Sequence, residues 1–112
     1  MIAITIVKSG QNIMTIDITG HSGYAEAGSD IVCSAISTLA ENLALSLDKI
    51  AGVTPKIIRD EIIPHFSISI PSTTKGKKFE DAQILMQSAV LGMKEVRDGN
   101  MKYIKIKEIK NV

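Results

Sequence analysis

Cys33 and His21 are the two side chains whose chemical types suggest covalent catalysis. Cys33 is the only cysteine of the chain, and His21 is one of two histidines. A thiol and an imidazole within hydrogen-bonding distance form an activated nucleophile, because the imidazole accepts the thiol proton. The twelve-residue separation between them is not diagnostic in itself. The pair is functional only if the surrounding elements bring the two side chains together.

A helix is predicted to begin just before Cys33 and to cover about residues 31–51. Its apolar positions recur at three- and four-residue steps and form one buried face, which consists of Val32, Ile36, Leu39, Leu43, Leu47 and Ile50. Cys33 then lies off that face in the first turn, where unpaired amide groups and the helix dipole favour a thiolate. Alternatively, Cys33 is an inert, buried side chain, as many cysteines are.

A glycine-containing loop is predicted between the two residues. Residues 20–30, GHSGYAEAGSD, include three glycines and show no hydrophobic period, which is typical of a loop. Loops of this length in small domains are usually functional or disordered. His21 opens the loop at the end of a predicted strand, and Cys33 follows its end, so the two can be neighbours in space. Alternatively, His21 bonds only to the local backbone.

Asp30 and Ser37 are candidate supporting residues. Asp30, or its neighbour Ser29, is suited to the N-cap of the predicted helix. The Asp30 carboxylate is also suited to orienting a histidine, and the two roles are compatible. Ser37 follows Cys33 by one helical turn, so both lie on the same helix face. Its hydroxyl therefore either lines the site or faces solvent.

The remaining pattern predicts a single small α+β domain over residues 1–112. Alternating apolar residues at 2–7, and Met14, Ile16 and Ile18 after a turn, predict a hairpin. Two further strands are predicted at residues 56–62 and 65–70, and a last strand at residues 101–109. The order is ββαββαβ, a mostly antiparallel sheet packed with two helices.

The second helix is predicted to follow a polar, basic connection at residues 71–78. Glu80 and Asp81 open it, because acidic residues complement the helix dipole. Residues 98–100 end it. Its apolar stripe is predicted to consist of Ala82, Leu85, Met86, Ala89, Met93 and Val96.

Charge and composition argue against several other functions. The formal net charge of +1 gives no long-range attraction to nucleic acid or to an anionic membrane. One cysteine and two histidines cannot complete a four-ligand zinc site unaided, and no phosphate-binding motif is present. His65 shares a predicted strand face with Ser67 and Ser69 and is expected to be solvated. We expect no metal, no cofactor and no direct nucleic-acid partner.

The N-terminal residues and the apolar runs predict the location. Basic residues do not precede an apolar stretch at the start of the chain, as a signal peptide requires. No apolar run approaches the roughly 20 residues that span a bilayer. We therefore expect a cytoplasmic protein without a membrane segment.

Residues 20–37, GHSGYAEAGSDIVCSAIS, resemble the signature of the ribosomal-processing cysteine protease family Prp. That signature is approximately Gly-His-x-Gly-Tyr, a short glycine-containing loop, and then Asp-Ile/Val-Val-Cys-Ala/Ser-Ala-Val/Ile-Ser. The chain length and the predicted order of elements agree with the family over essentially the whole chain. Ser34 stands where alanine is frequent, which is a minor change.

The resemblance implies a small cytoplasmic bacterial cysteine endopeptidase that forms homodimers. Members of the family remove an N-terminal extension from large-subunit ribosomal protein number twenty-seven, after a pair of phenylalanines. By the same resemblance, Cys33 is the nucleophile, His21 is the base, and Asp30 and Ser37 belong to the site region. The loop is expected to admit the substrate and to order around it, and its residues are Gly20, Ser22, Gly23, Tyr24 and Gly28.

The interpretation from the residues and the resemblance is a Cys–His protease. Backbone N–H groups near Ser34, at the expected helix start, are candidates for stabilising the oxyanion. Two alternatives stay open: a non-catalytic ribosome-associated binding module in which Cys33 is inert, and a thiol redox sensor. The lack of a second, resolving cysteine argues against an intramolecular sensor.

Overall fold

The computed structural model describes residues 1–20 and 27–111, with residues 27–30 described by their backbone alone. The elements are β1 (Ile2–Ser9), β2 (Asn12–Thr19), α1 (Ala27–Lys49), β3 (Lys56–Asp60), β4 (His65–Ser69), α2 (Gly76–Asp98) and β5 (Ile104–Lys110). The predicted order ββαββαβ and the α+β class are therefore confirmed.

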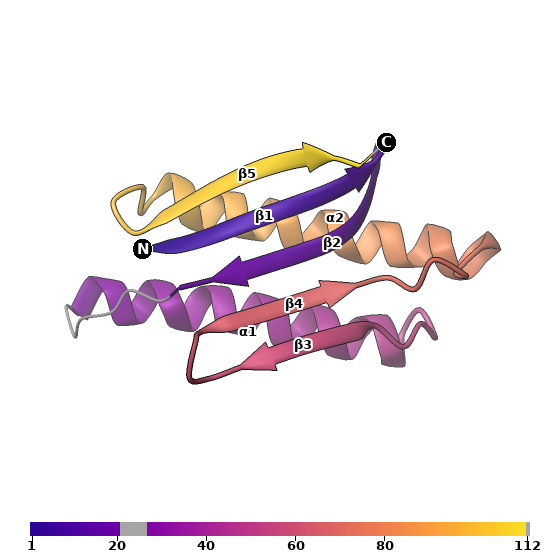
Figure 1. The fold of residues 1–112 in the computed structure, drawn as a ribbon, viewed down its shortest axis with the longest axis horizontal. Helices are drawn as coiled ribbons and strands as arrows, with labels where there is room; N and C mark the ends of the chain where they lie inside the picture. The colour runs from indigo at the N-terminus through magenta and orange to yellow at the C-terminus, as the bar shows by residue number, and fades with distance from the viewer. Residues whose placement is uncertain (21–26, 112) are drawn as a thin grey trace.

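The five strands form one sheet in the order β3-β4-β2-β1-β5. Three of the neighbouring pairs are antiparallel, and β1 and β5 are parallel. Both helices lie against the same face of the sheet, and the other face is not covered by a helix (Figure 1). The parallel pair is possible because α2 carries the chain back along the sheet before β5 begins.

The core lies between the sheet and the two helices. From the sheet it takes the side chains that point toward the helices, which include Ile4, Ile6, Ile16 and Ile68, each 1% exposed or less. In β2 the predicted alternation breaks down at its start, because the register between β1 and β2 shifts between Val7 and Lys8. Such a bulge adds one residue to a strand. Ile13 is consequently buried and Met14 only half-buried, which corrects the prediction.

α1 begins earlier than the sequence pattern predicted. Its first residue is Ala27, so residues 27–30 belong to the helix, and neither Ser29 nor Asp30 is the N-cap. The prediction placed the start at the first apolar position, because Gly28, Ser29 and Asp30 are weak helix formers and carry no helical signal. Cys33 is therefore the seventh residue of α1, in its second turn. At the other end the helix ends at Lys49, so Ile50 lies outside it. Ile50 is 72% exposed and is not part of the predicted buried face.

α2 also begins four residues before the predicted start, at Gly76. Its first turn contains Lys77 and Lys78 and no acidic residue. Lys77 Nζ lies 3.0 Å from Asp81 Oδ2, and ion pairs four residues apart stabilise a helix. This pair supports the additional turn, which corrects the prediction that residues 71–78 are all connection. The predicted stripe is confirmed at Ala82, Met86, Ala89 and Met93, which are buried.

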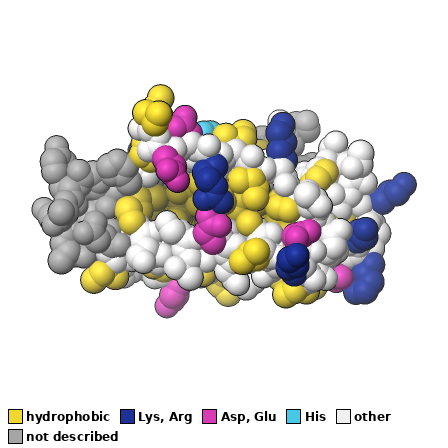
Figure 2. Space-filling model, turned by 90° about the horizontal axis from the view of Figure 1, so that it is seen from below, with side chains coloured by type: hydrophobic (Ala, Val, Ile, Leu, Met, Phe, Trp, Pro, Cys, Tyr) yellow, Lys and Arg dark blue, Asp and Glu magenta, His cyan; other side chains and the backbone are white. Residues whose placement is uncertain are grey.

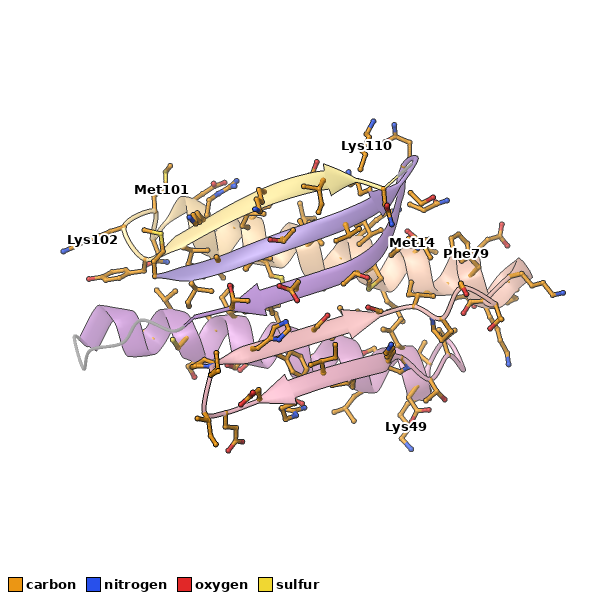
Figure 3. The ribbon with its side chains drawn as sticks, viewed as in Figure 1. Met14, Lys49, Phe79, Met101, Lys102 and Lys110 are labelled. Atoms are coloured by element: carbon orange, nitrogen blue, oxygen red, sulfur yellow. The ribbon has the colours of Figure 1, made fainter. Side chains whose placement is uncertain are left out.

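The last strand is shorter at its start than predicted. Met101 and Lys102 lie in the turn between α2 and β5, whereas Lys110 lies at the opposite end of the strand (Figure 3). The turn is closed by the Tyr103 N–H, which donates to the Asn100 carbonyl at 2.9 Å. Pairing with β1 begins only at Ile104, opposite Ile2.

One segment of α1, Ile31–Lys49, is long and apolar enough to cross a membrane by length and composition alone. The same segment supplies the buried residues Val32, Ile36, Leu43 and Leu47 to the core. Packing against the sheet accounts for these apolar positions, which are part of the 28% of the segment that is buried. We interpret the segment as the core helix of the domain.

Candidate functional site

Cys33 opens into a cleft of about 330 Å³ between α1 and the β3–β4 hairpin. Figure 2 looks at this side of the molecule and shows hydrophobic side chains recessed between charged ones. The lining from α1 comprises Cys33, Ile36, Ser37, Ala40 and Glu41. The sheet and the β3–β4 turn line the rest, which includes Ile2, Ile18, Gly20, Arg59, Pro64, His65 and Phe66.

The cleft exists because α1 does not cover the edge strand. Every residue of β3 is exposed, although β3 pairs with β4 along its whole length. Ile18, Phe66 and Arg59 stand opposite one another on β2, β4 and β3. Side chains at opposite positions point to the same face of a sheet. This row therefore forms one wall of the cleft, and α1 forms the other.

Cys33 lies at the border between the core and this cleft. Its side chain is half-buried and packs against the core residues. Ser37 lines the same cleft and is exposed, as expected for a residue one turn later. Cys33 lies in the second turn of α1, whereas the effect of the helix dipole falls off within the first turn. The prediction that the helix start favours a thiolate at Cys33 is therefore weakened.

Ser34 points away from this cleft. It lines a separate groove on the outer surface of the helices, together with Ile31 and Thr38. Its predicted place at the helix start is wrong, because Ser34 is the eighth residue of α1. In an α-helix only the first four N–H groups lack a partner within the helix. The Ser34 N–H is therefore not among the groups available to an oxyanion.

The end of β2 reaches the cleft that contains Cys33. Gly20 lines it, has a positive φ of 75°, and donates its N–H to the Pro64 carbonyl at 3.0 Å. His21 is the next residue along the chain. The residues His21, Ser22, Gly23 and Tyr24 lie outside the described part of the structure. Gly28 belongs to α1, so the predicted loop is shorter than residues 20–30.

His65 has a partner that the sequence did not indicate. Its Nε2 lies 2.6 Å from Asp17 Oδ1, and both side chains are about one-third exposed. Asp17 faces Ser67 across β2 and β4, so His65 is its diagonal neighbour, within reach of a long side chain. As predicted, the His65 side chain shares the sheet face of Ser67, which no helix covers, because it alternates with Phe66 along β4.

The end of the cleft remote from Cys33 carries an ion pair that sequence reasoning missed. Arg59 Nη1 donates to Glu41 Oε1 at 2.6 Å. This hydrogen bond to Glu41 raises the pKa of Arg59 above its ordinary value. Arg59 Cζ also lies 4.5 Å from the centroid of the Phe66 ring. The two charges are 18 residues apart in the sequence, and no local pattern joins them.

The described residues contain no cluster of three or more His, Cys, Asp or Glu side chains able to hold a metal ion. Across residues 1–20 and 27–111, the side chains at the cleft thus offer a thiol, a hydroxyl and an ion pair over an apolar floor.

Comparison with known proteins gives consistent matches over the whole fold. The family model described as cysteine protease Prp matches residues 1–105. The ribosomal processing cysteine protease Prp of Bacillus subtilis (strain 168) is 25% identical over 97 residues, which are 86% of this chain and 87% of the relative. A crystal structure from Streptococcus mutans is 28% identical with a TM-score of 0.90, and covers 99% of this chain and 96% of its own.

A structure of the essential ribosomal processing protease Prp from S. aureus, in complex with a substrate peptide, has the same fold. Its TM-score is 0.85 at 19% sequence identity, and the match covers 97% of this chain and 100% of that chain.

Proposed function

The chain belongs to the cysteine protease Prp family, and from this we propose that it is an endopeptidase in which Cys33 and His21 form the catalytic dyad. One observation carries the proposal. Cys33 and Gly20 line the same cleft, although they are 13 positions apart in the sequence. Gly20 directly precedes His21 in the sequence, and this adjacency supports the proposed pairing of His21 with Cys33.

The proposed reaction proceeds in two steps. His21 takes the proton of Cys33, and the sulfur attacks the carbonyl carbon of the scissile peptide bond. His21 then gives that proton to the leaving amine, and a thioester remains on Cys33. In the second step His21 accepts a proton from water, whose oxygen attacks the thioester and releases the acid product and the thiol.

Asp30 is proposed to support His21 rather than to cap the helix. The N-cap role is excluded because α1 begins at Ala27. Asp30 lies three positions before Cys33 in the same helix, about one turn away. The oxyanion is proposed to be stabilised by N–H groups of the first turn of α1, in place of Ser34. Ser37 is proposed to contact the bound peptide, since it lines the cleft beyond Cys33.

The proposed substrate is the N-terminal extension of the large-subunit ribosomal protein number twenty-seven, cleaved after a pair of phenylalanines. The relative from Bacillus subtilis carries the name of a ribosomal processing protease, and the resemblance of residues 20–37 supports the same substrate here. The cleft is compatible with aromatic side chains, because its floor is built from Ile2, Ile18, Ile36 and Ala40. Burial of an aromatic ring against such a floor is strongly favourable.

We also propose, from the same resemblance, that the protein acts as a homodimer in the cytoplasm. The modest net charge of +1 supports a peptide substrate rather than direct binding to ribosomal RNA. Light scattering of the purified protein at micromolar concentration tests the dimer, and a monomer mass would contradict it.

Replacement of Cys33 tests the proposed activity. The wild-type chain is expected to cut a peptide that contains Phe-Phe followed by a small residue, as shown by mass spectrometry of the products. Cys33→Ala and Cys33→Ser should abolish cleavage. The free energy of unfolding should fall by only about 1 kcal/mol, because one half-buried atom is changed.

A Cys33→Ala protein that cuts at the wild-type rate would refute the proposal. Alkylation of the wild-type thiol as a function of pH separates the alternatives. An inert thiol, as in a binding module, reacts slowly at every pH, whereas an activated thiol reacts below neutrality. Peptide cleavage then distinguishes a protease from a redox sensor.

A further inference from the structure

The ion pair between Glu41 and Arg59 spans the cleft at a defined distance from the thiol. Glu41 follows Cys33 by eight positions on α1, about 12 Å along the axis at a rise of about 1.5 Å per residue. Arg59 reaches it from β3, with a contact of 2.6 Å. The cleft therefore runs along α1 and is crossed by a charged contact at its far end.

Apolar packing does little to fix the distance between β3 and α1. All residues of β3 are exposed, and Ile57 and Ile58 are 40% and 46% exposed. β4 is anchored by its pairing with β2 and by the buried Ile68, whereas β3 contributes no buried side chain that would fix its separation from α1. A direct contact between a side chain of β3 and a side chain of α1 restrains that separation.

The guanidinium of Arg59 also contacts the ring of Phe66, which is the aromatic residue in the wall of the cleft. Arg59 Cζ lies 4.5 Å from the Phe66 ring centroid, a cation–π distance. Phe66 is half-buried and lines the cleft. Its ring thus contacts the residue that also pairs with Glu41, and it packs against the core as well. The ion pair is therefore a restraint on the width of the cleft beside this ring.

We propose that Glu41 and Arg59 are specificity-determining residues, whose ion pair sets the width of the cleft at Phe66 and so selects an aromatic over an aliphatic side chain of the peptide. This inference rests on the proposed peptidase function. An aromatic substrate residue gains from ring–ring packing on Phe66 only when the ring is held in place. An aliphatic side chain makes no ring–ring contact, so its binding does not depend on how the Phe66 ring is held.

The exposure of the pair distinguishes this role from a structural one. Both side chains are 49% exposed, and exposed ion pairs contribute little to stability. Breaking the pair should therefore leave the midpoint of urea unfolding nearly unchanged while it alters substrate preference. High salt should weaken the preference of the wild-type chain in the same direction, because salt screens exposed charges.

The test compares pairs of peptides that differ only by Phe→Leu, made in turn at each of the four residues before the cleaved bond, because an extended peptide covers about 12 Å in about four residues. For the wild-type chain we expect a preference in kcat/KM of about tenfold for the phenylalanine peptide. Glu41→Gln and Arg59→Gln should reduce that preference to about twofold, mainly through KM for the phenylalanine peptide. Arg59→Lys keeps a cation near both partners and should recover part of the preference. Arg97→Gln removes an ion pair with Asp98, does not touch the cleft, and should change nothing.

Two results would overturn the proposal. One is an unchanged preference in both Gln variants, and the other is an equal loss on both peptides. Calorimetric binding of the two peptides of each pair, with Cys33→Ala in every chain, measures the preference without cleavage. If the Cys33→Ala chains bind with the expected preference but the chain with Cys33 intact cleaves neither peptide, the peptidase function is contradicted and the role of the pair is supported. A chain that binds neither peptide contradicts both.

Discussion

Cys33 owes its environment to the body of α1 rather than to the helix end. It is the seventh residue of the helix, and its side chain packs at the border of the core and the cleft. The unpaired N–H groups of the helix lie upstream, where the dipole effect is concentrated. Activation of the thiol is therefore expected to come mainly from an imidazole, and this expectation can be tested.

His21→Ala is expected to lower turnover by about 10² or more through loss of the general base. It should also move alkylation of Cys33 to higher pH, because a neighbouring imidazolium favours the thiolate. Steady-state cleavage and iodoacetamide alkylation as a function of pH measure the two effects. The matched control is His65→Ala, which changes the other histidine of the chain. His65 is paired with Asp17, so this variant should retain most of the turnover. The reverse ranking of the two variants would contradict the proposed dyad.

Gly20→Ala is expected to impair both folding and turnover. Gly20 has a φ of 75°, and an added Cβ would lie 2.5 Å from the Met1 carbonyl oxygen, which belongs to the backbone. Gly10 has a φ of 61° with nothing within 4 Å of an added Cβ, so Gly10→Ala isolates the cost of the backbone angle alone. That cost is about 1–2 kcal/mol. Urea unfolding should show a larger loss for Gly20→Ala, and equal losses would show that the close approach to Met1 is harmless.

At the scale of secondary-structure elements, a buried glutamine joins α2 to the irregular start of β2. Gln83 is 6% exposed, accepts the Ile13 N–H and donates to the Ile13 carbonyl, both at 2.8 Å. The register between β1 and β2 shifts just beside Ile13, which pairs with Lys8. Backbone groups near a bulge lose regular partners, and the side-chain amide of Gln83 supplies both a donor and an acceptor.

Gln83→Leu is expected to reduce the free energy of unfolding by about 2 kcal/mol or more. The reason is that the buried N–H and carbonyl of Ile13 would both lose their partner. Gln87→Leu on the same helix changes an exposed residue and should shift stability by less than about 0.5 kcal/mol. Urea denaturation of the two variants measures the difference. Similar stabilities for both would indicate that the amide is dispensable.

At the scale of the whole molecule, charged contacts join the C-terminal strand to the rest of the domain. β5 is an edge strand, and Glu108 in it lies 3.4 Å from Lys8 of β1 and 3.3 Å from Lys94 of α2. The hydrogen bond from Lys94 is the main cause that lowers the pKa of Glu108 below its ordinary value of 4.5. Three elements therefore meet at one carboxylate.

The contribution of Glu108 to stability is expected to depend on pH. Since its pKa is lower in the folded state than in the unfolded state, this contribution is fully present above the unfolded value of 4.5. It is lost as the pH falls through the folded value. Glu108→Gln should be less stable than wild type at pH 7, by less than about 1 kcal/mol because the pair is exposed. The difference should shrink as the pH falls below 4.5. Urea unfolding at pH 7 and at a series of lower pH values measures it, and a difference that persists undiminished in acid would contradict the assignment.

Much of the architecture was predictable because it depends on local periodicity. Alternation at Ile2, Ile4 and Ile6 and the helical spacing of Val32 and Ile36 each arise from neighbours within one element. The element order followed from such patterns. The helix starts did not, because Ala27 and Gly76 lie in stretches with no apolar stripe and with weak helix formers. At α2 the ion pair between Lys77 and Asp81 supports the additional turn.

The sequence by itself determined the element order, the buried faces and the motif that places His21 and Cys33 in a known family. The tertiary structure alone decided how the cleft is built. The pairs Glu41–Arg59 and Asp17–His65 join residues 18 and 48 positions apart, and each depends on the strand order β3-β4-β2-β1-β5. Local patterns carry the period of each strand but not which strands are neighbours. Contacts between strands and helices therefore become visible only when the chain is folded.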